Sequence, residues 1–188
     1  MSTRTACLIA VGFRLFAQDP QEPRAVFGIT VVIPSALQGR IYYIKRNSQK
    51  LPGFKRKKPV GTIYTTALNV PLQDFKQGFP GVSDRVEWFA IDYTGRFWAE
   101  KEGDYTFSLM SDDGSKLYID GKLEIDNDGV HPPRERKEIV PLRHGVHDIR
   151  VSYFQGPRFL LALVLKIAPP GEALRIFSTD ELKPPPSP

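Results

Sequence analysis

The sequence has very little cysteine and histidine, and it has no long apolar run. Cys7 is the one cysteine in 188 residues, which excludes an internal disulfide framework and a cysteine-rich zinc site. The longest mostly apolar run, Phe159–Ile167, covers nine residues and includes Lys166, whereas a membrane-spanning helix needs roughly 18. We therefore predict no transmembrane segment. The composition, 41% hydrophobic and 25% charged, is that of a globular domain with a buried core.

Motifs of catalysis are also missing. The sequence contains no G-x-S-x-G elbow, no H-E-x-x-H pair and no phosphate-binding G-x-x-x-x-G-K-[ST] loop. The three histidines are His131, His144 and His147, and no spacing singles out one of them as a general base. We predict that the chain is not an enzyme.

Positive charge is concentrated in one stretch and negative charge in another. Residues 40–58 carry eight basic and no acidic side chains, although the whole chain has a net charge of only +5. This stretch is interpreted as a solvated loop, or alternatively as a contact for an acidic glycan, an envelope surface or a partner protein. It lacks the aromatic pattern of a single-strand binder, and we predict no nucleic-acid partner. Residues 111–129 contain six carboxylates against two lysines, so these carboxylates must be solvated, paired or gathered round a cation.

The chain divides into four parts. Residues 1–17 resemble a secretory signal that is cleaved after Ala17, with a first strand of the domain as the alternative. Residues 18–38 are predicted to be a spacer or an edge strand, and residues 39–169 the β domain. Residues 170–188 form a C-terminal extension with a proline-rich tail.

Alternating apolar residues and frequent Gly and Pro breakers predict an all-β fold. Tyr105, Phe107 and Leu109 alternate with Thr106 and Ser108, as expected for strands with one buried face. About ten strands are predicted, in an antiparallel β-sandwich or barrel. They cover residues 25–33, 39–45, 60–67, 86–93, 95–100, 104–110, 116–118, 122–126, 146–154 and 158–167.

The hairpin around Asp120-Gly121 has two candidate registers. A two-residue turn would place Leu117 opposite Glu124 and mix the faces. A three-residue loop, Ile119-Asp120-Gly121, would pair Leu117 with Leu123 and set Lys116 opposite Glu124. We predict the three-residue loop.

The segment Ser111-Asp-Asp-Gly-Ser115 is followed by this strand pair and the turn Asp126-Asn-Asp-Gly129. Together with Trp88, Gly95-Arg-Phe-Trp98, Gly103-Asp-Tyr-Thr-Phe107 and His147–Phe154, it closely resembles the PA14 domain family. The resemblance implies an extracytoplasmic β-sandwich or barrel module. Members of that family occur in bacterial toxins, glycosidases, adhesins and yeast flocculins, and several bind carbohydrate through calcium.

What the resemblance implies for the site is a calcium ion held by Asp112 and Asp113, joined by a cis peptide bond that turns both carboxylates to one side. Gln155 would supply a further oxygen ligand, and Asn127, Tyr153 and Arg158 would orient the sugar. In other members the aspartate pair only holds the turn, which is the alternative role here. Trp88, Phe97, Trp98 and Tyr118 are interpreted as core or sheet-surface aromatics rather than as a sugar platform.

Two functions follow from these observations. The first is a secreted or cell-surface lectin-like module that binds a glycan or a cell-surface polysaccharide with calcium. The second is a structural subunit of a surface assembly or filament, in which self-association brings the basic stretch of one copy onto residues 111–129 of the next.

Overall fold

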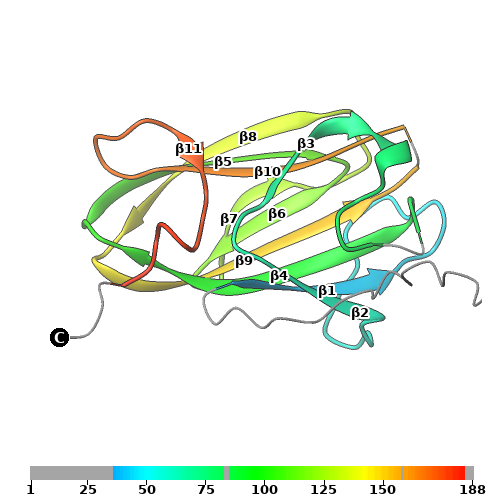
Figure 1. The fold of residues 1–188 in the computed structure, drawn as a ribbon, viewed down its shortest axis with the longest axis horizontal. Coiled ribbons are helices and arrows are strands. Elements are labelled where there is room, and N and C mark those ends of the chain that lie inside the picture. The colour runs from blue at the N-terminus through cyan, green and yellow to red at the C-terminus, as the bar shows by residue number, and fades with distance from the viewer. Residues whose placement is uncertain (1–35, 83–84, 158, 185–188) are drawn as a thin grey trace, which may run out of the picture.

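The computed structural model describes residues 36–82, 85–157 and 159–184, and these form two antiparallel sheets packed face to face (Figure 1). The six-stranded sheet has the order β2 (Gly61–Thr65), β1 (Leu37–Tyr43), β4 (Phe89–Ala99), β9 (Gly145–Gln155), β6 (Ser115–Ile119), β7 (Lys122–Asn127). The other sheet has the order β11 (Arg175–Ile176), β10 (Leu160–Ala168), β5 (Gly103–Asp112), β8 (Arg134–Leu142), and β3 (Asn69–Asp74) also pairs with β10. A single 3₁₀ turn, η1 (Phe75–Gln77), follows β3. The predicted all-β antiparallel sandwich is confirmed. No helix in the described ranges has the length and apolar character needed to cross a bilayer.

The core lies between the two sheets and is built by the alternation visible in the sequence. Tyr105, Phe107 and Leu109 of β5 are at most 1% exposed, and the apolar residues of β9 meet them from the opposite sheet. The ring of Phe79 stacks on that of Tyr153 at a centroid distance of 5.1 Å. Because both sheets place an aromatic stripe on their inner faces, burial of these side chains favours the two-layer arrangement.

Some strands differ from the prediction. The two predicted strands 86–93 and 95–100 overlap one continuous strand, β4, which runs through Gly95. β3 and β8 were not predicted, since β3 contains Pro71 and β8 begins with five consecutive charged residues, Arg134–Glu138. Within the described chain β8 is an edge strand, where charged side chains are tolerated because one side of the strand faces water. The predicted strand 25–33 and the predicted signal sequence 1–17 lie outside the described residues.

The prediction of a three-residue loop in the hairpin around Asp120-Gly121 is wrong. Ile119 pairs with Lys122, so Asp120 and Gly121 form a two-residue turn, with φ values of 50° and 81° that suit it. The register shifts between Leu117 and Tyr118, and Leu117 pairs with Ile125. This β-bulge places Leu117 and Ile125 on the same buried face, which removes the objection to the shorter turn, while Leu123 lies opposite Tyr118 on the outer face. Lys116 consequently meets Asp126, at 3.2 Å, instead of Glu124.

The outer face of the six-stranded sheet carries three rows of side chains that run across the strands. An apolar row consists of Tyr42, Ala90 and Phe154; a charged row of Arg40, Asp92, Ser152, Lys116 and Asp126; and a third row of Gln38, Thr94, Arg150, Tyr118 and Leu123. The apolar row is covered by residues 45–58, which connect β1 to β2 and which we call the basic loop. Figure 1 shows this loop in cyan beyond the end of β1.

Packing and hydrogen bonds hold the basic loop in place. Leu51 and Phe54 pack on a cluster of Ile44, Trp88, Ala90 and Phe154. The Phe54 ring lies 5.0 Å from that of Tyr42, and the Leu51 N–H donates to a carboxylate oxygen of Asp128 at 2.8 Å. The basic stretch and the acidic segment predicted from the sequence therefore meet within one chain.

Candidate functional site

The two adjacent aspartates lie where strands of both sheets end together. β5 ends at Asp112, and after Asp113 and Gly114 the chain enters β6. The end of β9, at Gln155, lies beside them, followed by Gly156. In Figure 1 this is the right-hand end of the sandwich, where β5 and β9 finish. Both aspartate side chains are buried, with exposures of 6% and 3%.

The peptide bond between Asp112 and Asp113 is cis, as the family resemblance implies. The carboxylate of Asp113 is held by its neighbours. One oxygen accepts from the backbone N–H of His131 at 3.1 Å, and the other accepts from the backbone N–H of Gly156 at 2.7 Å. The amide nitrogen of Gln155 donates to the same oxygen over a longer 3.4 Å. Asp113 is thereby fixed in orientation by groups from two loops.

Asp112 has a different environment. None of the described residues donates a hydrogen bond to its carboxylate. Burial, and secondly the negative charge of Asp113, raise the pKa of Asp112 to about 7. The pKa of Asp113 is also raised by burial, although the two backbone hydrogen bonds and the neighbouring His131 pull it back down. A positive charge placed between these carboxylates would offset both the cost of burying their charges and the repulsion between them.

Tyr153 and Gln155 stand behind the aspartate pair and are fully buried. The Tyr153 hydroxyl lies 2.8 Å from the backbone carbonyl oxygen of Asp112 and 2.5 Å from the side-chain oxygen of Gln155, and both are acceptors. Burial, together with the charges of Asp113 and Asp112, raises the pKa of Tyr153 well above its usual value. The hydroxyl therefore stays protonated and remains a donor.

Two glycines bring backbone close to the pair. A Cβ on Gly156 would lie 2.9 Å from a carboxylate oxygen of Asp113, and a Cβ on Gly114 would lie 2.4 Å from the Phe154 ring. Both distances are shorter than ordinary van der Waals contacts. Only glycine at position 156 lets its N–H approach the carboxylate as closely as it does.

Asn127 supports the site from one layer further away. Its side-chain nitrogen donates to the Ser111 hydroxyl at 3.1 Å and to the Arg134 carbonyl at 3.0 Å, while its oxygen accepts from the Arg134 Nε at 2.6 Å. A ring nitrogen of His131 lies 2.9 Å from the backbone carbonyl of Asn127. Asn127 thus holds the loop that delivers the His131 N–H to Asp113.

The structure brings together five of the six residues predicted from the sequence. Asp112, Asp113, Gln155 and Tyr153 are in contact, Asn127 lies behind them, and Arg158 lies outside the described residues. His131 and Gly156 were not predicted as donors, because they donate through the backbone N–H, which every residue except proline has. Among the described residues no group of three or more His, Cys, Asp or Glu side chains is arranged to hold a metal. A cation here would thus combine two carboxylates with neutral oxygens.

The chain is a two-sheet β-sandwich in which the aspartate turn joins β5 of one sheet to β6 of the other. The PA14 domain family model matches residues 35–176, and the chain belongs to that family. The PA14 sugar-binding domain from an RTX adhesin superposes with a TM-score of 0.62 at 16% identity, over 77% of this chain and 96% of that one.

Two curated proteins match part of the chain. The anti-sigma-I factor RsgI3 of Acetivibrio thermocellus is 31% identical over 86 residues, which is 45% of this chain and 13% of that protein. A β-glucosidase of Kluyveromyces marxianus is 30% identical over 99 residues, which is 47% of this chain and 12% of that protein. The chain therefore spans only a small share of these curated relatives.

Proposed function

We propose that this PA14 domain is an extracytoplasmic carbohydrate-binding module and that Asp112 and Asp113 bind the calcium ion through which it recognises sugar. The observation that supports the proposal most is the pair of adjacent, buried carboxylates, of which one receives no hydrogen bond from the described residues. The sugar-binding RTX adhesin domain has the same fold. A glycan or a cell-surface polysaccharide is the ligand that we propose.

The donor chemistry suits a hard divalent cation. Both carboxylates supply oxygen ligands of the type that calcium prefers, while the Gln155 side chain presents its nitrogen to Asp113 and its oxygen to Tyr153. Asp113 is already oriented by the N–H groups of His131 and Gly156, so little ordering would accompany binding. The side-chain oxygen of Gln155 keeps a second lone pair beyond the one that faces Tyr153. The ion would supply Lewis-acidic sites for vicinal sugar hydroxyls.

The remaining predicted residues have distinct roles in this proposal. Asn127 and Tyr153 are fully buried, and we assign them to positioning the aspartates rather than to touching the sugar. Arg158 stays the predicted sugar contact. No catalytic step is assigned to the domain, which agrees with its placement in a family of mostly binding or structural modules.

Calorimetry on EGTA-treated protein, followed by a glycan array with calcium and with chelator, tests the proposal. Asp112→Asn and Asp113→Asn should each abolish the calcium heat and the array signal. Asp104→Asn is the matched control, because Asp104 is exposed and lies at the start of β5, away from the pair. Absence of calcium heat together with an array that is blank in both conditions would contradict the proposal.

The alternative, a filament subunit held by charge-complementary contacts, loses part of its basis. Lys116 lies 3.2 Å from Asp126 and 3.3 Å from Asp128, and Asp128 also holds the basic loop through Leu51. These carboxylates are already paired within the chain. Light scattering at low and high salt separates the two functions, because the filament requires oligomers that dissociate as salt increases.

A further inference from the structure

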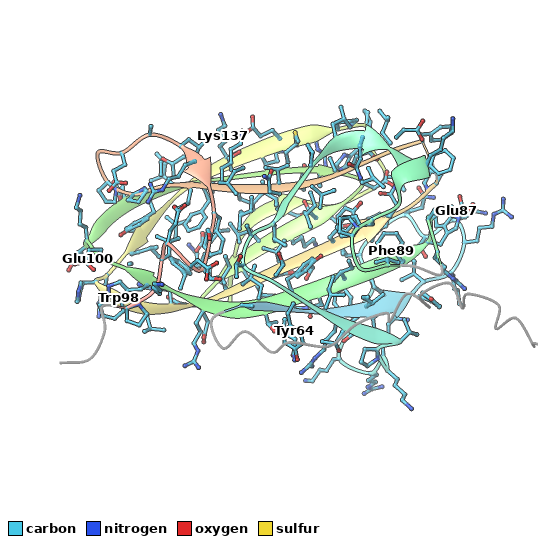
Figure 2. The ribbon with its side chains drawn as sticks, viewed as in Figure 1. Tyr64, Glu87, Phe89, Trp98, Glu100 and Lys137 are labelled. Atoms are coloured by element: carbon cyan, nitrogen blue, oxygen red, sulfur yellow. The ribbon has the colours of Figure 1, made fainter. Side chains whose placement is uncertain are left out.

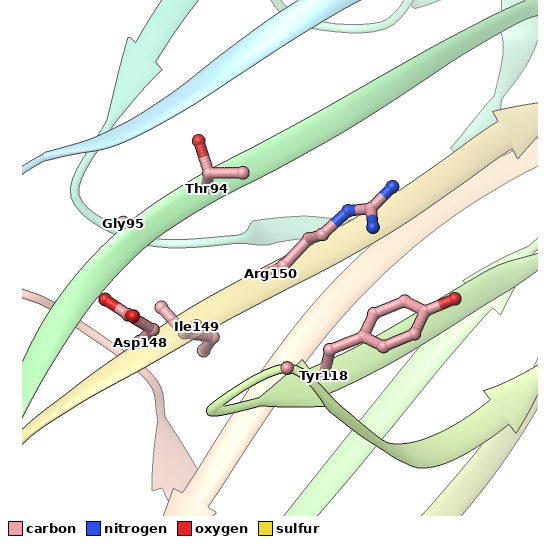
Figure 3. Close-up of a pocket in the computed structure, with 7 residues that line it drawn as sticks. Thr94, Gly95, Tyr118, Asp148, Ile149 and Arg150 are labelled. Atoms are coloured by element: carbon pink, nitrogen blue, oxygen red, sulfur yellow. The ribbon is translucent and has the colours of Figure 1, made fainter. Parts of the chain in front are cut away.

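A groove crosses the outer face of the six-stranded sheet, beside the basic loop and away from the aspartate pair. Two hollows, of about 360 and about 250 Å³, share Tyr118 and Arg150 as lining residues. Figure 3 shows the first of them, with Thr94 on β4, Arg150 and Asp148 on β9, and Tyr118 on β6. The second is bounded by residues 51–54 of the basic loop. Asp112, Asp113 and Gln155 line neither hollow.

Arg150 is held in the middle of this groove. Its Nε donates to a carboxylate oxygen of Asp92 at 2.7 Å, and its guanidinium carbon lies 5.1 Å from the centre of the Tyr118 ring and 5.7 Å from that of Phe54. No described residue accepts a hydrogen bond from its two terminal nitrogens, and 40% of the side chain is exposed. A fixed guanidinium with free terminal N–H groups is suited to bidentate recognition of a carboxylate or sulfate.

The basic loop borders the second hollow with residues 51–54 and carries further positive charge. All eight basic side chains from Arg40 to Lys58 are exposed, and the charge of Lys50 helps to lower the pKa of Asp126. Tyr42 and Phe54, which pack on each other, anchor the segment that carries these charges. A fixed set of like charges repels itself and attracts a polyanion along its whole length.

The aromatic residues favour a polysaccharide over a nucleic acid. Tyr42 is only 4% exposed, and the Arg85 guanidinium lies over the Tyr43 ring at 4.1 Å, so these two aromatics of the basic stretch are covered rather than open for stacking on a row of bases. The half-buried rings of Tyr118 and Phe54 flank Arg150, which suits a sugar ring next to an acidic group.

We propose that this groove, together with the basic loop, is a second binding site, for an anionic polysaccharide whose acidic group pairs with Arg150 while its neighbouring residues follow the basic loop. The site uses none of the aspartate pair. It therefore operates without calcium and stands or falls independently of the lectin proposal.

Binding is measured in EGTA with heparin as the sulfated probe, polygalacturonate as the carboxylated probe and dextran as the neutral one. We expect at least one polyanion to bind, dextran not to bind, and the affinity to fall roughly tenfold or more from about 50 to about 200 mM salt. Absence of binding to both polyanions at the lower salt concentration overturns the proposal. So does tighter binding of single-stranded or duplex DNA than of either polysaccharide.

Two sets of variants place the site. Combined Lys55→Gln, Lys57→Gln and Lys58→Gln should weaken binding roughly tenfold, since each lost contact lowers affinity and salt dependence together. The matched control removes the same charge at Lys101, Lys137 and Lys183, which are exposed elsewhere. Figure 2 shows Lys137 across the molecule from Tyr64 of β2. Equal weakening by both triple variants would mean that net charge alone is responsible, and would overturn the assignment to this site.

Arg150→Lys tests the arginine itself, because it keeps the charge that faces Asp92 but loses the planar donor pair. We expect its melting temperature to stay close to that of the wild type. Because it loses a bidentate contact, this variant should bind the preferred polyanion roughly fivefold or more weakly. An unchanged affinity would remove Arg150 from the site and refute the proposed pairing.

Discussion

Replacing Asp112 by Asn should make the calcium-free domain more stable at neutral pH. The pKa of Asp112 in the folded protein is about 7, because the side chain is buried and faces the charge of Asp113, whereas the ordinary value is 3.8. The folded protein then binds a proton more tightly than the unfolded chain. Between these two values the free energy of unfolding falls as the pH rises, because unfolding then releases the proton that the folded protein holds on Asp112.

The size of the effect follows from the two pKa values. One pKa unit corresponds to 1.36 kcal/mol, so the ionisation of Asp112 costs at most about 4 kcal/mol by about pH 8. For a domain of this size that corresponds to roughly 10 °C in melting temperature. The Asn variant carries no such charge. Its melting temperature should equal that of the wild type near pH 4, where Asp112 is protonated, and exceed it increasingly towards pH 8.

Circular dichroism melts from about pH 4.5 to about pH 8.5 in EGTA measure this difference. Asp104→Asn, at an exposed position, is the control and should follow the wild type. A difference between Asp112→Asn and the wild type that is constant over the whole range would refute the reasoning. Added calcium should narrow the difference at neutral pH, because only the wild type would gain binding energy, by about 2.7 kcal/mol at a hundredfold excess over Kd and by about 4.1 kcal/mol at a thousandfold excess, which is enough to cancel it.

Three further substitutions test the surroundings of the site. Gly156→Ala should destabilise the domain by about 1–3 kcal/mol in denaturant titrations, as expected for overpacking, while Gly53→Ala, where a Cβ meets nothing within 4 Å, should change little; equal effects would contradict the close approach of Gly156 to Asp113. Tyr153→Phe should cost about 1–3 kcal/mol, because buried acceptors lose their donor, and a neutral result would show that this hydroxyl is not needed. Asp128→Ala should release the basic loop and speed its cleavage by trypsin in mass-spectrometric time courses; cleavage at the wild-type rate would mean that packing alone holds the loop.

The sequence was sufficient for the fold class and for the position of the aspartate turn at the centre of the candidate site. Alternation in β5 and β9 identified the inner faces correctly, because burial of aromatic side chains dominates there. The Asp-Asp-Gly-Ser segment marked the turn that the structure places at the end of β5. β8 escaped prediction because an edge strand with one face in water needs no apolar period.

The hairpin and the donors of Asp113 could not be predicted for a different reason. The extra residue of the β-bulge is Glu124 on β7, whereas β6 pairs with β9 in an unbroken register, and the pairing with β9 is not encoded in the hairpin itself. His131 is 18 residues from Asp113 in the sequence, and it contributes a backbone N–H that any residue but proline could donate. Such contacts depend on tertiary structure rather than on residue type.

The strand directions also decide how the protein is best attached to a surface. The Trp98 N–H donates to the carbonyl of Leu182 at the end of the sandwich where β9 begins, whereas the aspartate pair lies where β9 ends. Eleven residues of extended strand separate the two ends by roughly 35 Å. An attachment made close to Leu182 would lie on the side remote from Asp112 and Asp113, so a sensor chip or array probe coupled there would leave the end that carries the aspartate pair open to solution.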